Sequence, residues 1–477
     1  MKKFTLVALA MMASASCFAQ TTLWDGENPE ISNKDYAGFW SDGKPELCDN
    51  PETNGINNSA HCLKFTINKD SKVVKLPFRE WMKPSMNGSK RISLMIKKNV
   101  NENVCVELSD PTDGSVGYWK KQVVWYSGDN KWQKLVFDFS SNGDFDNPGI
   151  MTITAQTNDF EGEQTVYIDN IVIEDAPRIN GKLFSEYNAE NPITGDLKLT
   201  GAWMKGASLN ADADWKENTY NDFEYFNSHA TDGVTSVDMR GTVTKDVDVA
   251  QFFKNPNTIV YADAAYDHAN VVVNGTATNL LLTDANAFNA PYDFTAESVK
   301  LIRSLQNGIN SFVLPFEVSA NELGANKIAT YKNCVLGNVA NFETAESVVA
   351  NTPFLTTDAK EASELTFTNK RIVATPETLG TEFVGVYTRT NAEGKYGIDG
   401  NGKLHKGGED AYVNPFHAYL NVEGVTSVAF DGSVTAINNI AADKVANTAV
   451  YDLSGRRVNG KLQKGLYIMN GKKVVVK

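Results

Sequence analysis

The ten residues from Thr165 to Glu174, TVYIDNIVIE, form the most constraining stretch of the 477-residue chain. Apolar side chains, mostly β-branched or aromatic, fill this stretch on both sides of one polar pair, Asp169-Asn170. Such a composition is typical of a strand that is buried on both faces. Pro177 follows almost at once, and proline cannot donate a hydrogen bond to a neighbouring strand. We therefore expect the last strand of a first domain here, with a linker behind it.

Strand-like runs separated by Gly, Asn, Asp and Pro also precede this stretch, and long helical periodicity is missing. The runs are Leu63–Ile67, Val73–Phe78, Arg91–Ile96, Asn103–Leu108, Gln122–Tyr126, Gln133–Phe139 and Gly149–Gln156. Eight or nine short strands within about 150 residues are typical of an antiparallel β-sandwich, and the jelly roll is the commonest arrangement of that number.

The length of the chain exceeds what one hydrophobic core supports and indicates roughly three folded units of about 150 residues. We predict an all-β protein with a signal peptide at 1–19, a jelly-roll β-sandwich at 20–177, a mostly-β middle region at 178–433 and a small C-terminal β-domain at 434–477.

Two short helices are expected in the middle region. Thr295 precedes a short apolar-periodic segment that runs to Arg303, which is the pattern of a capped helix. Ser319 and Glu322 have the spacing of a capping box at the start of a segment that ends at Leu323.

The N-terminus has the layout of a secretory leader. Lys2 and Lys3 precede an apolar run from Phe4 to Met12 and a small-residue exit that ends at Ala19. Cleavage before Gln20 is expected, and a lipoprotein anchor at Cys17 is the alternative. No other stretch approaches the about 20 apolar residues that span a bilayer. We therefore predict a secreted protein, or one displayed at the outer-membrane surface, without a transmembrane helix.

Charge and cysteine content narrow the partners further. The net charge of -13 argues against nucleic acid, whose binding depends on clustered Lys and Arg. Cys48 and Cys62 flank a polar, Asn-rich loop, and in an oxidising compartment we predict a disulfide that closes it. Cys105 and Cys334 lie in apolar-alternating surroundings and are expected to be buried thiols.

Aromatic residues concentrate in the first third, which holds six of the eight tryptophans. Sugar rings stack their C–H faces on such side chains, so an exported sandwich with surplus aromatics favours glycan binding. Trp119, Trp125 and Tyr126 lie among polar residues near a turn and are the predicted ligand-binding residues. In the alternative interpretation, these three side chains lie in the core, which is the position that we expect for Trp24, Trp40 and Trp132.

No catalytic motif supports an enzyme. The five histidines are isolated, and no nucleophile elbow, phosphate loop or zinc motif occurs. Asp159, Glu161 and Glu163 lie close together, but a loop of acids is usually a solvated surface. Enzymatic activity is therefore an uncertain and less favoured interpretation. If the protein is an enzyme, we expect an unrecognised glycoside hydrolase.

Four phrases of the first third carry a resemblance. Leu23–Glu27, Asn50–Ser59, Lys131–Phe139 and Tyr167–Ile171 together resemble the galactose-binding-like jelly rolls of secreted Bacteroidetes proteins, which include many carbohydrate-binding modules. The resemblance covers about a third of the chain.

That likeness implies a structural calcium ion. An acidic residue near the first strand and an Asp in the last strand commonly hold it, and Glu27, Asp169 and also Asp25 are the matching positions. Carboxylate oxygens suit Ca²⁺, which takes several oxygen ligands in irregular geometry. In the alternative, Asp169 caps a strand end or pairs with a lysine.

The middle region resembles a segment that recurs in Prevotella and Bacteroides surface proteins, and this likeness implies no particular activity. The phrases that carry it are Asn255–Tyr261, Asn310–Phe316, Ala350–Leu355 and Asn414–Leu420. Their Pro-Phe pairs join a rigid turn residue to an aromatic anchor, which suits edge strands and corners.

The tail reverses the charge of the chain, with eight Lys and Arg against two Asp from Val434 onward. Strands are expected at Ala449–Leu453, Gly465–Met469 and Lys473–Lys477, and Asn470-Gly471 is a strong hairpin signal. The tail resembles the C-terminal sorting domains of the Bacteroidetes type IX secretion system, which implies the secretion machinery as a partner. A basic cap on the middle region is the alternative.

Together these features predict a secreted or cell-surface, non-catalytic glycan-binding protein whose partner is a polysaccharide or other glycan. The alternative is a structural or adhesive surface protein without a sugar site.

Overall fold

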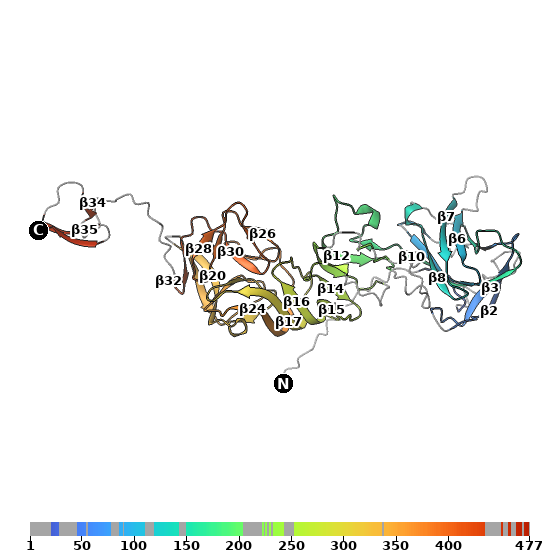
Figure 1. The fold of residues 1–477 in the computed structure, drawn as a ribbon, viewed down its shortest axis with the longest axis horizontal. Coiled ribbons are helices and arrows are strands. Elements are labelled where there is room, and N and C mark those ends of the chain that lie inside the picture. The colour runs from blue at the N-terminus through green and yellow to red at the C-terminus, as the bar shows by residue number, and fades with distance from the viewer. Residues whose placement is uncertain are drawn as a thin grey trace, which may run out of the picture.

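The computed structural model describes residues 21–27, 45–53, 56–77, 85–88, 90–109, 119–142, 149–203, 222–223, 225–226, 229, 232–242, 252–335, 338–434, 450–451, 457–458, 464–469 and 472–476. Almost all of the regular structure in these residues is β-strand. The N-terminal sandwich and the middle region lie in a row along the long axis of the molecule (Figure 1).

Two antiparallel sheets form the N-terminal sandwich. The first has the order β2-β3-β10-β5-β8, with β1 also paired to β10. Its strands are β1 (Thr21–Trp24), β2 (Glu46–Asp49), β3 (His61–Ile67), β5 (Lys90–Lys98), β8 (Gln133–Asp138) and β10 (Gln164–Asp175). The second has the order β4-β9-β6-β7. Its strands are β4 (Val73–Pro77), β6 (Glu102–Ser109), β7 (Trp119–Tyr126) and β9 (Ile150–Thr154), and a 3-10 turn, η2 (Ser140–Asn142), follows β8.

This strand order confirms the predicted jelly roll, because β3 to β10 wind between the two sheets in the jelly-roll sequence. All eight strands expected from the sequence are present. Their inward side chains form one core between the sheets, and Trp24 lies within it. Trp132 is also buried, as expected, while Trp40 lies outside the described residues.

The polar pair in β10 marks a change of partner. Residues 164–168 pair with β3, and Ile171 to Ile173 pair with β1 on the same side. The register with β5 on the other side shifts between Asp169 and Val172. Asn170 absorbs this shift with a φ of 46°, a left-handed conformation that Asn tolerates better than most residues. The pair is therefore a bulge that lets one strand hold three neighbours.

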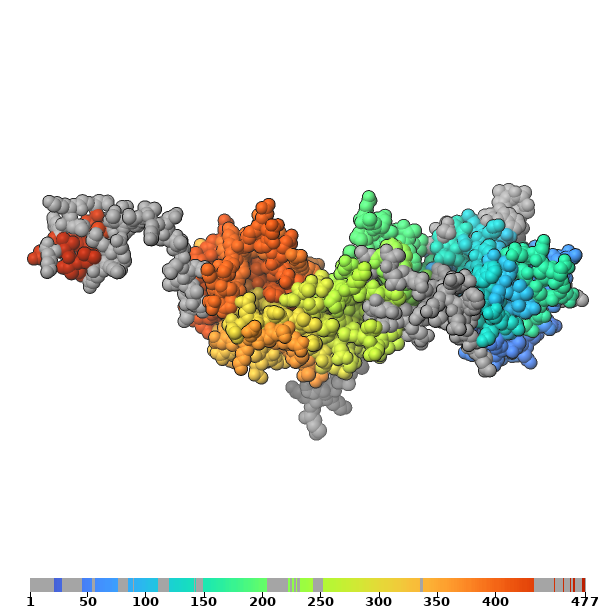
Figure 2. Space-filling model, in the orientation of Figure 1, coloured from blue at the N-terminus to red at the C-terminus, as the bar shows by residue number. Residues whose placement is uncertain are grey.

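The sandwich joins the middle region through a short link and a buried ion pair. β11 (Arg178–Ile179) begins three residues after the end of β10. The Arg91 guanidinium on β5 donates to both carboxylate oxygens of Asp222, at 2.9 and 3.0 Å, and to Asp138 at 2.9 Å. Both Arg91 and Asp222 are buried. The surfaces of the sandwich and of the first strands of the middle region meet in Figure 2.

An eight-stranded sheet begins the middle region, in the order β11-β12-β13-β14-β15-β16-β17-β24. Its further strands are β12 (Gly195–Thr200), β13 (Val234–Asp238), β14 (Ile259–Ala262), β15 (Val271–Val273), β16 (Thr276–Thr283), β17 (Phe294–Leu305) and β24 (Ala362–Ile372), and a 3-10 turn, η3 (Phe184–Glu186), lies between β11 and β12. The pairs from β12 to β15 are parallel. Strands that follow one another in the chain from β11 to β17 are therefore also neighbours in the sheet.

Buried asparagines close the turns of this stack. Asn257 donates to the carbonyl oxygens of Thr283 and Asn286 and accepts the N–H of Thr283. Asn270 makes a similar set of bonds to Pro256 and Leu281. These side chains form hydrogen bonds with backbone groups that the short strands leave unpaired. Buried backbone N–H and C=O groups need such partners.

The helix expected at Thr295–Arg303 is wrong: these residues lie in β17. Buried and exposed side chains alternate along most of this strand, and it pairs with β16 on one side and β24 on the other. Pairing with two long strands therefore outweighs the weak helical periodicity of this short segment. The second expected helix is a single 3-10 turn, η7 (Asn321–Leu323). The Glu322 carboxylate accepts the Ser319 N–H at 2.9 Å, which is one of the two bonds of a capping box, while the Ser319 hydroxyl also donates to Glu322 and, within the described residues, does not accept a backbone N–H.

The rest of the middle region consists of small sheets around two cores. One sheet contains β18 (Ser311–Phe312), β23 (Phe354–Thr357), β20 (Lys327–Val335), β21 (Val339–Ala345), β31 (Ser427–Phe430) and β32 (Ser433–Val434). Another contains β25 (Phe383–Val386), β30 (His417–Leu420), β27 (Tyr396–Ile398) and β28 (Leu404–Lys406). Two-stranded pairs are formed by β19 (Val318–Ser319) with β22 (Ser347–Val348) and by β26 (Thr390–Asn391) with β29 (Tyr412–Val413).

A four-stranded sheet forms the tail, in the order β34-β33-β35-β36. Its strands are β33 (Val450–Tyr451), β34 (Arg457–Val458), β35 (Gly465–Met469) and β36 (Lys472–Val476). Met469 pairs with Lys472, so the predicted hairpin is present. Within the described residues, no helix is long and apolar enough to cross a membrane.

Candidate functional site

The second sheet of the sandwich turns one face to the core and the other to solvent. Along β6, fully buried side chains alternate with half-buried ones, which is the period of a sheet covered on one side only. We call the outward side chains of this sheet the open face. Its described members are Val73, Lys75, Asn103, Cys105, Glu107, Ser109, Lys121, Val123, Trp125, Ile150, Thr152 and Thr154.

Strand pairing arranges the open face in rows across four strands. One row runs Lys75, Thr152, Glu107 and Lys121, and the next runs Val73, Thr154, Cys105 and Val123. Three inter-strand spacings of about 4.8 Å make the face roughly 14 Å wide. The first row offers hydroxyl, carboxylate and ammonium groups together, and the second is mainly apolar.

Trp125 lies at the edge of this face, on β7. Its side chain is 37% exposed, and it pairs with Asn103 on β6. Val123, two residues earlier on the same strand, is 49% exposed. An exposed indole beside an amide can stack on an apolar ring face while the amide binds a substituent of that ring.

The other two predicted ligand residues have different outcomes. Tyr126 is fully buried, so its predicted contact with a ligand is wrong. Its hydroxyl lies between the carbonyl oxygens of Lys98 and Lys131, at 2.9 and 2.7 Å, and shares its one hydrogen between these two acceptors. Alternation along β7 allows only one of two neighbouring aromatics to face outward. Trp119 begins β7 opposite Ser109, its side chain lies outside the described part, and it stays a prediction.

The described residues of the open face include two lysines, one carboxylate and one thiol. Glu107 is the single carboxylate among its described residues, whereas glycoside hydrolysis uses a pair. Lys121 lies directly opposite Glu107 in the register. Cys105 faces outward and is half-buried, and Cys334 is half-buried as well, so the expectation that both are buried thiols is wrong. Burial and the nearby Glu107 charge raise the pKa of the Cys105 thiol.

Asp25 and Glu27, two of the three predicted calcium ligands, lie directly after β1. The Asp169 carboxylate is buried and accepts hydrogen bonds from the Asn57 side chain at 2.9 Å and from the Asn170 N–H at 2.8 Å. Glu27 accepts the His61 N–H at 2.6 Å, and Asp25 accepts the Glu27 N–H at 2.7 Å. Each carboxylate therefore has a protein donor.

The fit of these residues to calcium is partial. Burial raises the pKa of Asp169, whose hydrogen-bond donors are neutral groups, and a bound cation would offset that cost. However, no three His, Cys, Asp or Glu side chains gather as a metal site in the described part of the chain. Calcium at Glu27, Asp169 and Asp25 stays a prediction.

The predicted disulfide partners lie opposite each other. Cys48 on β2 pairs with Cys62 on β3, and their Sγ atoms are 3.7 Å apart. Both are free thiols in the structure, so the disulfide stays a prediction. Burial, above all, raises the pKa of both thiols.

Sequence reasoning missed the polar part of the open face. Thr152 and Glu107 are about 45 positions apart and become neighbours only through the pairing of β6 with β9. The alternation around Cys105 indicated a one-sided strand, but it did not indicate which face was covered.

The fold and the open face define this chain as an all-β protein with a jelly-roll sandwich, one sheet of which is uncovered. Neither a family model nor a curated protein matches it.

Several solved structures are similar to part of the chain. One, from a study of promiscuous specificity in carbohydrate-binding modules of the β-sandwich superfamily, has 18% identity over 32% of this chain and 60% of that chain, with a TM-score of 0.24. The family 11 carbohydrate-binding module of the cellulase Lic26A-Cel5E of Clostridium thermocellum has 14% identity over 33% of this chain and 95% of that chain, with a TM-score of 0.22. An exo-β-agarase has 14% identity over 43% of this chain and 29% of that chain, with a TM-score of 0.26. This chain thus spans 60% of the first structure and less than a third of the agarase.

Proposed function

We propose that this protein binds glycans without cleaving them, through the open face of its N-terminal sandwich. The observation that carries the proposal is the exposed indole of Trp125, which lies beside the Asn103 amide on the open face and is separated by one mainly apolar row from the row of hydroxyl and charged side chains. Pyranose rings need both an apolar surface for their C–H faces and polar partners for their hydroxyls. The open face supplies both within a few residues.

Replacing Trp125 tests this proposal. Aromatic stacking contributes about 0.5–1.5 kcal/mol beyond area burial, and 1.4 kcal/mol corresponds to a tenfold change in affinity. We therefore expect Trp125→Ala to weaken glycan binding about tenfold, while the melting temperature hardly changes because the side chain is exposed. The full chain is first screened on a glycan array, and the dissociation constant of the best glycan is then measured by calorimetry for both proteins.

The matched control is Tyr412→Ala, which removes an aromatic that is 50% exposed in the middle region and should leave binding unchanged. Unchanged binding in a stable Trp125→Ala protein would remove this residue from any sugar site. Trp119→Ala, measured in the same way, assigns the remaining predicted residue.

A second candidate function is adhesion to another protein. Val123 and Trp125 form an exposed apolar strip on β7, which is the edge strand of its sheet, and such edges also pair with other chains. An array on which the intact chain binds no glycan would favour this function.

We also propose that the protein is exported and held or released at the cell surface. The leader-like N-terminus and the basic, strand-rich tail support this location.

A further inference from the structure

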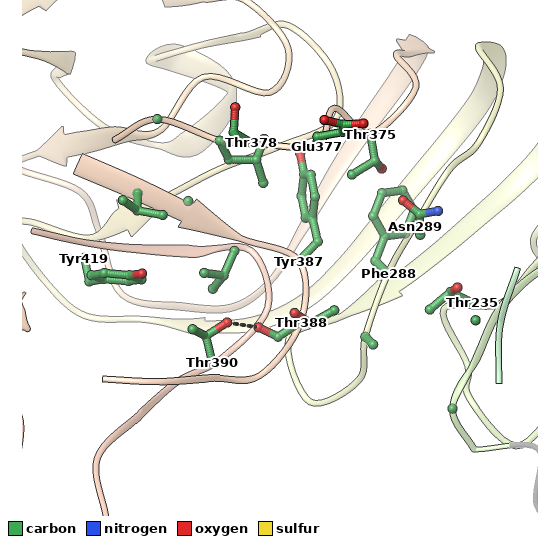
Figure 3. Close-up of a pocket in the computed structure, with 18 of the residues that line it drawn as sticks. Thr235, Phe288, Asn289, Thr375, Glu377, Thr378, Tyr387, Thr388, Thr390 and Tyr419 are labelled. Carbon is green, nitrogen blue, oxygen red and sulfur yellow. Dashed lines mark hydrogen bonds between the residues drawn. The ribbon is translucent and has the colours of Figure 1, made fainter. Parts of the chain in front are cut away.

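A cavity of about 630 Å³ opens in the middle region (Figure 3). Its walls come from the starts of β12 and β13, the loop at 287–289, the segment at 375–390 that includes β25, and Tyr419 on β30. Figure 3 shows Tyr419 and Thr235 on opposite sides of it. The volume lies within the range of about 300–1,000 Å³ that is usual for small-molecule sites. None of its residues belongs to the open face.

Neutral polar groups dominate the lining. Six threonines, at 194, 235, 375, 378, 388 and 390, line it together with the Asn289 amide. Among the described residues that line it, Glu377 is the only charged one, and none is Lys, Arg or His. The cavity therefore has no group that would neutralise an anion.

Some of these polar groups are already committed to the protein. The Thr235 hydroxyl donates to Asp196 at 3.0 Å, and Thr375 Oγ1 accepts the Ala290 N–H at 3.0 Å. The Asp196 carboxylate also accepts hydrogen bonds from Ser236 and Asn289, at 2.7 and 2.6 Å. Three donors thus satisfy this neighbouring carboxylate, which leaves it little capacity for a cationic ligand.

Other polar groups at the mouth are available. Glu377 and Thr378 are exposed, and within the described residues neither side chain has a hydrogen-bond partner. Val384, Phe288 and Tyr419 supply an apolar wall behind them. A carboxylate, free hydroxyls and an aliphatic or aromatic wall together match a ligand with many hydroxyl groups and apolar C–H edges.

We propose that this cavity is a second binding site, which takes one end of a neutral saccharide. Glu377 and Thr378 bind its hydroxyl groups, and the wall formed by Val384 and Tyr419 contacts its C–H edges. The site is independent of the open face and does not rest on the function proposed for it.

Calorimetry tests the site in full-length protein carrying Trp125→Ala, so that the open face contributes little. The probes are neutral trisaccharides of glucose, galactose and xylose. We expect at least one to bind, and Glu377→Gln and Thr378→Val each to weaken that binding about tenfold or more, which is the loss of about 1.4 kcal/mol. Ala287→Phe, which fills the cavity, should abolish binding.

The control is Thr366→Val, which removes an exposed hydroxyl on β24 outside the cavity and should bind as before. If Ala287→Phe does not fold, the two polar variants decide the question. The proposal is overturned if no trisaccharide binds, if binding survives all three cavity changes in folded protein, or if arginine amide binds in place of the sugars. If Trp125→Ala alone fails to weaken glycan binding, that result contradicts only the function proposed for the open face.

Discussion

Asp169 combines a structural and a chemical role at a single position. It sits at the bulge where β10 changes partner, and its buried carboxylate accepts neutral N–H groups. Since burial raises its pKa, the folded state resists its ionisation. The carboxylate therefore costs stability once the pH rises above its ordinary pKa of about 3.9, and a cation beside it would recover part of that cost.

This cost leads to a prediction about calcium. We expect EDTA to lower the melting temperature of the sandwich relative to millimolar calcium, because an ion bound only by the folded state stabilises it by mass action. Asp169→Ala should remove the response. Equal melting of the unaltered protein in EDTA and in calcium would show that the carboxylate is held by its hydrogen bonds alone.

His417 is a second residue whose protonation affects stability. Its Nδ1 lies 3.2 Å from the Arg303 guanidinium, and its Nε2 lies 3.2 Å from the Asp284 carboxylate. A neutral ring that accepts from Arg303 and donates to Asp284 satisfies both contacts. Burial and then the Arg303 charge lower the pKa of His417 below its ordinary value near 6.5.

The sign of the pH effect follows from that shift. Below about pH 6.5 the unfolded chain takes up a proton that the folded protein resists, so stability falls as the pH falls, by at most about 1.4 kcal/mol per pH unit. His417→Gln retains an acceptor for Arg303 and a donor for Asp284. We expect this variant to lose that part of the pH dependence, measured by urea unfolding between pH 5 and 8. An unchanged slope would contradict the role of His417.

Neighbouring residues also show what sequence could not decide. Trp125 and Tyr126 have similar surroundings in the chain, and alternation alone allowed either one to face solvent. The choice depends on the pairing of β7 with β6, which involves residues about 20 positions away. Eight of the ten strands of the sandwich were predictable because their apolar runs and turn residues are local.

At the scale of elements, β17 shows how tertiary pairing overrides a local pattern. Thr295 resembled a helix cap, but the strand lies between β16 and β24, and both contribute long ladders. The parallel order from β12 to β15 was not predictable either, because a short apolar run does not indicate whether the neighbouring strand is parallel or antiparallel to it.

Asn257 makes the stability of this stack testable. Asn257→Ala removes the side chain that pairs two carbonyls and one N–H, and each buried unsatisfied group costs about 1–3 kcal/mol. We expect the free energy of unfolding of the middle region to fall by about 2–4 kcal/mol, measured by denaturant unfolding. Asn279→Ala, at an exposed position on β16, is the control and should change it little. Equal effects of both variants would contradict the role of the buried amide.

At the scale of the whole molecule, the described part of the tail lies outside the hydrophobic cores. Among the described residues, none beyond Phe430 belongs to one of the four cores or packs against it. We therefore expect deletion of 435–477 to leave the melting temperature nearly unchanged. If the tail is a sorting signal, the truncated chain should accumulate in the periplasm of a type IX-secreting host, as measured by cell fractionation.

Two results would contradict this prediction. Truncated protein outside the cell would exclude the sorting role, and a large loss of thermal stability would indicate that the tail caps the middle region. The intact chain expressed in the same host is the control.

The path of β10 has a mechanical consequence when the chain is pulled from its C-terminal side. β10 lies between β5 on one side and β3 and β1 on the other, and it leads to β11 through Ala176 and Pro177. Tension from the middle region therefore acts along β10, across the direction of its hydrogen bonds. Loaded in shear, many of these bonds must break together, and the Arg91–Asp222 pair shares the tension at the same joint. The sandwich is thus built to resist tension that reaches it along the chain through β11.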